Sequence, residues 1–130
     1  MYKAMGIGRS DGAKRMEAMA NNWRFFGAPC GMIITIPKEM NSPQWTDVGF
    51  FLATLSLLAR ERGLHCCFQE AWANYSATIR EVLKVPDEDV VFAGVALGYA
   101  DLGVAVNGFV TARAPLDEFA TFHGDGFSRL

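Results

Sequence analysis

The stretch GVALGYAD, residues 94–101, decides how this chain of 130 residues is best interpreted. It closes the apolar run DVVFAGVALGY, residues 89–99, whose length and composition predict a buried β-strand. Two glycines, Gly94 and Gly98, interrupt the far end of that strand. Because glycine lacks a Cβ, its backbone lets a ligand approach closely, and the sequence therefore predicts ligand contacts at this strand end.

The segments before this strand predict two helices and a second strand. Asp11 predicts the start of a helix that continues to about Phe26. The run CGMIITIP, residues 30–37, is bounded by glycine and proline and predicts a buried central strand. A capping hydroxyl at Ser42, followed by a proline, predicts a longer helix that ends at Gly63.

This longer helix is apolar on almost every side. Its apolar residues do not fit on one stripe: Val48, Phe50, Phe51, Leu52, Leu55, Leu57 and Leu58. A helix of this kind needs cover on every side, and a short chain has few elements to provide it. We therefore expect the helix to form the interface of a homodimer, and the alternative is a central core helix in a monomer.

The remaining segments complete a single α+β domain over residues 1–130. LHCCFQ, residues 64–69, predicts a short strand, and SATIREVL, residues 76–83, predicts a helix. VAVNGFV, residues 104–110, has a strand-like pattern, and a helical turn is expected within residues 116–122. Helices mixed with apolar strands, without strict βαβ repetition, are typical of the α+β class.

Composition excludes several classes of function. A net charge of −2 gives no reason to expect nucleic acid or a membrane surface as partner. The longest apolar stretch, Val48–Ala59, is shorter than the ~20 residues that span a bilayer, and the start has no signal-peptide pattern. Three cysteines lack the spacing of a zinc site or disulfide framework. We expect a cytoplasmic protein, without metal, whose cysteines are small apolar residues.

Several blocks of the chain resemble the flavin-dependent nitroreductase family in their order and separation. They are FFGAP (25–29), ARERGL (59–64), GVALGYAD (94–101), Asn107 and TARAPLDEF (111–119). Members of that family normally begin with a longer N-terminal part that carries an Arg-rich phosphate-binding segment. The resemblance thus implies the C-terminal part of a nitroreductase-like α+β fold, truncated at its N-terminus, with a small mixed sheet and flanking helices.

The resemblance also implies flavin mononucleotide (FMN) as cofactor and a set of residues to hold it. Arg113 is the candidate for the phosphate, because a guanidinium binds phosphate through two hydrogen bonds. Gln69 and Glu70 fall where the family contacts the polar edge and N5 of the flavin ring. Leu97 and Gly98 are expected close to the isoalloxazine. No catalytic side chain is expected, because the flavin carries the chemistry.

The implied function is an oxidoreductase that moves electrons from NAD(P)H through FMN to a nitroaromatic, a quinone or a similar acceptor in two hydride steps. The aromatic candidates for the acceptor pocket are Trp45, Trp72 and Tyr75. Two alternatives stay open. One is a catalytically silent homodimerising module that has lost the flavin, and the other is an unrelated α+β domain that binds a small ligand.

Overall fold

The computed structural model describes residues 2–124, and its elements confirm the α+β class. The helices are α1 (Gly12–Ala20), α2 (Ser42–Glu61) and α3 (Ser76–Leu83), and the strands are β1 (Cys30–Pro37), β2 (His65–Gln69) and β3 (Asp89–Gly98). Short 3₁₀ segments connect them: η1 (Tyr2–Met5), η2 (Asn21–Gly27), η3 (Glu70–Tyr75), η4 (Ala105–Gly108) and η5 (Leu116–Glu118).

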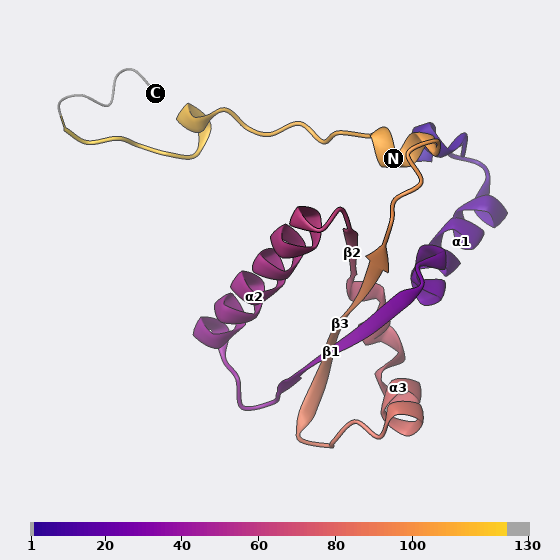
Figure 1. Ribbon diagram of the computed structural model, residues 1–130, viewed down its shortest axis with the longest axis vertical. Coiled ribbons are helices and arrows are strands. Elements are labelled where there is room, and N and C mark those ends of the chain that lie inside the picture. Colours follow the sequence, from indigo (N-terminus) through magenta and orange to yellow (C-terminus); the bar gives the residue numbers. More distant parts are fainter. Residues whose placement is uncertain (1, 125–130) are drawn as a thin grey trace.

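The three strands form one sheet in the order β1-β3-β2, and both pairs are antiparallel (Figure 1). The predicted mixed sheet and the predicted central position of residues 30–37 are therefore wrong, because β1 lies at an edge. β3 takes the centre, since it carries the longest buried run, with Val91, Ala93, Val95 and Ala96 all buried. Burial from both faces favours the most continuously apolar strand in the middle.

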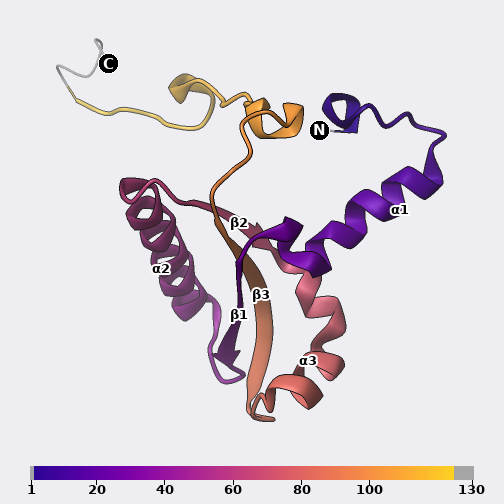
Figure 2. The same cartoon turned by 45° about the vertical axis from the view of Figure 1, so that its right-hand side comes forward.

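Helices cover the two faces of the sheet unequally. α2 lies along one face, and η2, η3 and α3 lie on the other (Figures 1 and 2). The core lies between these layers, around Val95 of β3, with Ile79 supplied by α3 and Ala59 supplied by α2. Because successive residues of a strand point to opposite faces, β3 contributes side chains to both layers.

The boundaries of α2 follow local signals closely. The N-cap is Asn41 rather than the predicted Ser42, and it forms a capping box with Gln44, whose Oε1 accepts a hydrogen bond from the backbone N–H of Asn41 at 3.2 Å. Gly63 has a φ of 74° and follows the helix end, as predicted.

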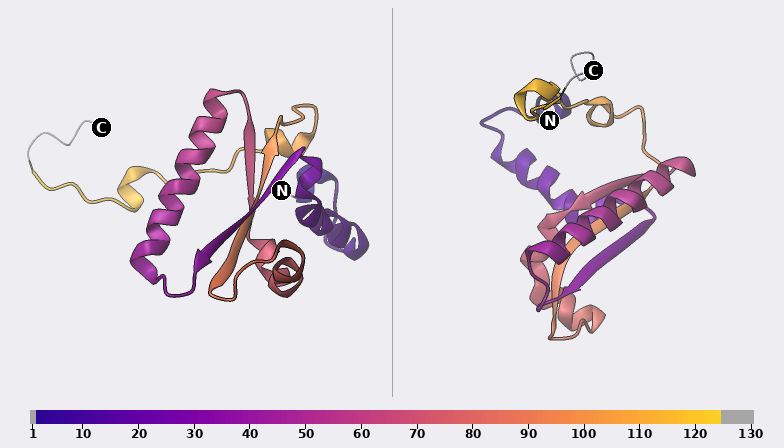
Figure 3. Two further views of the ribbon diagram at one scale, coloured as in Figure 1. Left: turned by 60° about the horizontal axis from the view of Figure 1, so that its bottom comes forward. Right: turned by 90° about the vertical axis from the view of Figure 1, so that its left-hand side faces the viewer.

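Most of the apolar side chains that surround α2 are not covered by other parts of the single chain. Only Val48 and Ala59 of this helix are buried. Five large apolar side chains of this helix are exposed: Trp45, Phe50, Phe51, Leu57 and Leu58. Figure 3 shows why, since one side of the helix faces the sheet and no other element of residues 2–124 packs along its outer side.

The first helix is shorter than the sequence predicts. α1 ends at Ala20 and continues as η2, and the backbone of Phe25 and Phe26 is left-handed, with φ of 49° and 51°. A left-handed backbone cannot continue an α-helix. The physical reason is tertiary, because this conformation directs the ring of Phe25 onto Trp72, with 4.6 Å between ring centroids.

The chain after β3 leaves the body of the molecule as an extended arm. The strand predicted over residues 104–110 is wrong, because this segment forms η4 and irregular chain without a strand partner. The arm runs away from both edges of the sheet (Figure 1). Residues 104–110 therefore have no edge strand beside them with which to pair. The helical turn predicted within residues 116–122 is present as η5.

Candidate functional site

Gln69, the last residue of β2, is the most informative polar side chain of the domain. It is 2% exposed and is the one buried polar or charged residue in the described part of the chain. Its Oε1 accepts a hydrogen bond from Nε1 of Trp72 at 3.2 Å, whereas its Nε2 is buried without a partner in residues 2–124. An indole N–H can only donate, so the amide oxygen must face Trp72 and the amide N–H groups must face elsewhere.

Such a buried donor is costly. Leaving an N–H group without an acceptor in a low-dielectric interior costs about 1–3 kcal/mol. The atom therefore suits a cofactor that presents carbonyl oxygens or ring nitrogens, as the polar edge of a flavin does, once neighbouring side chains admit it. This orphaned amide is the feature of the structure that fits FMN.

Protein side chains pack closely against the two glycines that the sequence predicts to lie near a ligand. A Cβ on Gly94, the cross-strand partner of Gln69, would lie 2.1 Å from Cδ1 of Trp72. A Cβ on Gly98 would lie 2.7 Å from Cδ of Pro29. On the sides where these Cβ atoms would project, protein side chains already fill the space, and the ligand contact at this strand end stays a prediction.

The structure separates the predicted flavin contacts along the sheet. Gln69 pairs with Gly94 and His65 pairs with Gly98, so Gln69 and Gly98 lie at opposite ends of β2. Four residues of strand correspond to roughly 13 Å. Leu97 pairs with Cys66, and it points to the sheet face opposite to that of Gly98, since neighbouring residues of a strand alternate.

The two charged candidates are both exposed. Glu70 is adjacent to Gln69 in sequence and begins η3. Arg113 lies in the extended arm, where its Nη1 donates to the carbonyl oxygens of Thr111 and Ala112 at 3.2 Å each and to the Thr111 hydroxyl. Gln69 and Glu70 are therefore together, Leu97 and Gly98 are together, and Arg113 is apart from both pairs within one chain.

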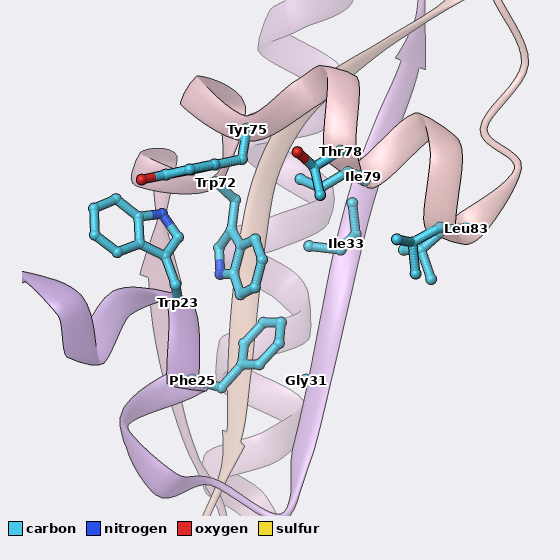
Figure 4. Close-up of a pocket in the computed structure, with 10 residues that line it drawn as sticks. Trp23, Phe25, Gly31, Ile33, Trp72, Tyr75, Thr78, Ile79 and Leu83 are labelled. Atoms are coloured by element: carbon cyan, nitrogen blue, oxygen red, sulfur yellow. The ribbon is translucent and has the colours of Figure 1, made fainter.

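An aromatic cavity of about 580 Å³ opens between η2, η3 and α3, above β1 (Figure 4). Two ring pairs stand in its wall. Phe25 and Trp72 are stacked, with an interplanar angle of 26°, and Trp23 meets Tyr75 edge-on with 4.9 Å between centroids. None of the ten residues that line the cavity carries a charge.

Sequence reasoning found half of these rings. Trp72 and Tyr75 were candidates for an acceptor pocket and do line the cavity, whereas Trp45 lies outside it and packs edge-on against Phe92. Trp23 and Phe25 were missed as cavity residues. Their signal was the pairing of aromatic residues with the glycine turn at residues 23–27, which a helical interpretation obscured.

Phe25 reaches the cavity at the cost of backbone strain. Phe25 and Phe26 are both left-handed, and such conformations cost about 1–3 kcal/mol for residues other than glycine. The Phe25 ring lies over Gly31, where an added Cβ would come within 2.4 Å of Cε2. A strained backbone that holds an aromatic ring over a bare strand is a specific local arrangement, which only a glycine at position 31 permits.

Raised pKa values disfavour the reactive thiolate form of two cysteines, Cys66 and Cys67. Burial raises the pKa of the Cys66 thiol, and burial together with repulsion from Cys66 raises that of Cys67. All three cysteines are free. Within residues 2–124, no three His, Cys, Asp or Glu side chains come together as metal ligands, and no helix is both long and apolar enough to cross a bilayer.

A small antiparallel sheet with helices on both faces, a buried amide without an acceptor and an aromatic cavity define an α+β domain suited to flat ligands. The chain belongs to the nitroreductase family, whose model matches residues 7–99. This confirms the resemblance drawn from the sequence blocks.

Curated relatives carry the names of nitroaromatic reductases. The chain is 38% identical to a 4-nitrobenzoate reductase of Pseudomonas putida over 95% of its own length and 54% of that protein. It is also 38% identical to a chloronitrobenzene nitroreductase of Comamonas testosteroni, over 92% of the chain and 52% of that protein. The chain spans about half the length of the curated relatives it matches.

A solved structure shows the same fold. The FMN and NADPH-dependent nitroreductase NfnB of Sphigopyxis sp. strain HMH superposes with a TM-score of 0.91 at 40% identity, over 95% of this chain and 55% of that one. The FMN-dependent NfnB of Mycobacterium smegmatis, solved in complex with NADPH, gives a TM-score of 0.90 at 31% identity, over the same shares.

Proposed function

We propose that this chain acts as an FMN-dependent NAD(P)H oxidoreductase that reduces a nitroaromatic compound, a quinone or a similar acceptor. The observation that carries the proposal is the close superposition on an FMN and NADPH-dependent nitroreductase, with a TM-score of 0.91. The names of the curated relatives support a nitroaromatic acceptor. Three free thiols in the described residues favour a reducing compartment, and we include a cytoplasmic location in the proposal.

The residues of the chain would hold the cofactor rather than perform the chemistry. Bound FMN would supply the redox step, taking hydride from NAD(P)H first and passing electrons to the acceptor second. Gln69 would donate its unpaired amide N–H to the polar edge of the flavin, and Glu70 would lie beside it. Arg113 would bind the phosphate, since its guanidinium is exposed and meets only oxygens of its own arm.

We propose a homodimer as the state that completes this site. Arg113 is apart from Gln69 within one chain. A site that uses both residues would therefore combine Arg113 of one copy with Gln69 of the other. The exposed apolar face of α2, with Phe50, Phe51, Leu57 and Leu58, supports association with a second copy. Leu97 and Gly98 at the far end of β3 would then approach the isoalloxazine from the subunit boundary.

The test is a flavin titration of the purified chain followed by a turnover assay. Equilibrium dialysis with FMN gives the stoichiometry, and the absorbance band of bound flavin identifies the cofactor. NADPH and NADH oxidation is then followed with nitrobenzene or a quinone as acceptor. Saturable FMN binding together with acceptor-dependent oxidation supports the proposal, whereas absence of FMN binding at millimolar flavin contradicts it.

The separation of Arg113 from the other contacts favours one second candidate. A catalytically silent homodimerising module would keep the α2 face and the fold without assembling a phosphate site. The same titration separates the two functions, because a silent module dimerises without binding FMN.

A further inference from the structure

We propose that Asn107 is a site of spontaneous covalent modification, at which the side-chain amide is lost and the turn that begins the extended arm is opened. Asn107 lies in η4, where the chain has left β3 and the arm starts (Figure 1). The products are aspartate, isoaspartate and ammonia. This modification does not depend on flavin binding, because it concerns the root of the arm and not the cofactor.

The residue after Asn107 makes this asparagine the reactive one. Asparagine is a thermolabile residue, because the backbone nitrogen of the next residue can attack its side-chain carbonyl carbon. Asn107 is followed by Gly108, whereas none of the other four asparagines precedes a glycine. Glycine has no Cβ to hinder the attack and gives the backbone the freedom to reach the required geometry. Both residues are exposed, so water reaches the reacting atoms.

The reaction needs only water as co-reactant. The backbone nitrogen of Gly108 forms a bond to Cγ of Asn107, the bond from Cγ to Nδ2 breaks, and the Gly108 amide proton leaves with Nδ2 as ammonia. Water then opens the succinimide ring. Opening at Cγ gives aspartate, and opening at the backbone carbonyl carbon gives isoaspartate, in which the main chain runs through Cγ. No electrons are transferred, so neither an oxidant nor a reductant is required.

The local structure at η4 offers little resistance to this reaction. η4 has four residues, none of them buried, and the hydrogen bonds of a 3₁₀ turn have poor geometry. Local opening of such an exposed segment costs far less free energy than global unfolding. A Cβ added at Gly108 would meet no heavy atom within 4 Å beyond its own turn, so this side of the glycine is open.

The amide that would be lost holds the start of the arm in place. Nδ2 of Asn107 donates to the backbone carbonyl oxygen of Asp101 at 2.8 Å. The same oxygen accepts a hydrogen bond from the backbone N–H of Val104 at 3.3 Å, and Oδ1 of Asp101 accepts one from the N–H of Gly103 at 2.9 Å. Residues 101–107 therefore form one closed turn around Asp101.

Modification replaces a donor in this turn with a charged acceptor. A carboxylate at position 107 cannot donate to a carbonyl oxygen, so the hydrogen bond to Asp101 is lost. It also adds a negative charge next to a residue that is itself acidic, and the two charges repel. Isoaspartate lengthens the main chain by one carbon atom as well. We expect the turn to open and the arm, which carries Arg113, to change direction.

Incubation of the full chain at mildly alkaline pH, followed by peptide mass spectrometry, tests the site. A converted peptide shows the mass change of NH₂ replaced by OH, and its aspartate and isoaspartate forms separate by chromatography. We expect both forms at residue 107. Asn22 is the internal control, because its Nδ2 also donates to a backbone carbonyl oxygen, that of Met19 at 2.9 Å, but Trp23 follows it. Asn22 should stay unmodified in the same sample.

Gly108→Ala is the variant that tests the route of the reaction. Its new Cβ enters open space, and the φ of Gly108 is not in the left-handed region, so the fold and the bond from Asn107 to Asp101 should be kept. The same Cβ hinders the attack of the backbone nitrogen. We therefore expect most of the conversion at residue 107 to be lost in this variant, and circular dichroism checks that it is folded.

Asn107→Asp reproduces one product and tests the effect on the arm. Hydrogen exchange at the amides of Gly103 and Val104 should become about two- to tenfold faster, the change expected from the loss of one hydrogen bond in their turn. The amide of Gly8 is the control, because it donates to Oδ2 of Asp11 in another exposed turn and should keep its rate.

Three results would overturn the inference. One is a folded chain in which residue 107 stays unmodified, even if the urea-unfolded chain is converted, because η4 would then protect it. Another is equal conversion in the native chain and Gly108→Ala, or aspartate without isoaspartate, since direct hydrolysis would then be the route. The third is unchanged exchange at Gly103 and Val104 in Asn107→Asp, which would show that the amide does not hold the turn.

Discussion

The indole N–H of Trp72 donates to the side-chain oxygen of Gln69 at 3.2 Å, and this bond fixes the orientation of the Gln69 amide. Because the indole has no acceptor, the amide N–H groups point away from it and lack a partner in residues 2–124. Gly94 makes the arrangement possible, since any side chain there would occupy the place of the indole. The absence of a side chain at Gly94 of β3 thus allows the hydrogen bond that orients the Gln69 amide on β2.

Replacing Gly94 with alanine should destabilise the fold. The new Cβ would lie 2.1 Å from Cδ1 of Trp72, and overpacking of this kind costs about 1–3 kcal/mol. Gly49→Ala is the matched control, because nothing lies within 4 Å of its added Cβ and it stands inside α2, where alanine gains about 1 kcal/mol over glycine. Urea unfolding of both variants checks the opposite signs, and a stable Gly94→Ala protein would contradict the packing.

Elements with strong local signals were predictable from sequence. Residues 30–37 form β1 as predicted, because glycine and proline bound an apolar run. α2 ends within two residues of Gly63, since that glycine adopts the left-handed conformation that terminates helices. These signals act over a few neighbouring residues, and no distant contact is needed to read them.

Features that depend on distant contacts were not predictable in the same way. The order of the strands follows from which one is buried on both faces, and that is decided by the whole sheet. The end of α1 was misplaced because Phe25 turns toward Trp72, which lies 47 positions further along the chain. Gln69 and Arg113 were chosen by family resemblance, and no local pattern indicates that one is buried and the other lies in an extended arm.

A charge on the outer face of α2 should prevent self-association without unfolding the chain. Leu57 is 70% exposed in the single chain, so Leu57→Asp removes no core contact, but it would place an unpaired carboxylate in an apolar interface. Met16→Asp is the control, because Met16 is 75% exposed on α1 and outside that face. Sedimentation should give a dimer for the native chain and the control and a monomer for Leu57→Asp. A native monomer at micromolar concentration would reject the interface.

The adjacent free cysteines, Cys66 and Cys67, should react slowly with thiol reagents near neutral pH. Burial raises the pKa of the Cys66 thiol, and burial with repulsion from Cys66 raises that of Cys67, so both have less thiolate than a free cysteine at the same pH. Their labelling should be slower in the folded chain than in urea at pH about 8, and it should accelerate as the pH rises beyond the usual thiol range of about 8.5. Mass spectrometry assigns each label, and equal rates in both states would contradict the raised pKa values.

Replacing Lys84 with glycine should stabilise the chain. Lys84 follows α3 in a left-handed conformation, with φ of 56° and ψ of 40°, which costs side chains with a Cβ about 1–2 kcal/mol. Glycine removes this cost but gains freedom in the unfolded chain, so the net gain is roughly 0.5–1 kcal/mol. Lys84→Ala removes the same charge and keeps the Cβ, and it should show no such gain in urea unfolding.

The final prediction concerns the phosphate of the cofactor. If FMN binds as proposed, Arg113→Ala should weaken its affinity by about 1.5–3 kcal/mol, the value of a charge-assisted hydrogen bond. Riboflavin lacks the phosphate, and its affinity should change far less. The guanidinium of Arg113 meets only Thr111 and Ala112 in the single chain, so its loss removes no core contact.

The matched control is Arg9→Ala, which removes another exposed arginine far from the arm in sequence and should leave both flavins unaffected. Flavin fluorescence titrations with FMN and riboflavin give two dissociation constants for each of the three proteins, the native chain and the two variants. An equal loss for the two flavins would show that Arg113 acts through the fold. No loss for either would remove Arg113 from the site, because a phosphate ligand must distinguish FMN from riboflavin.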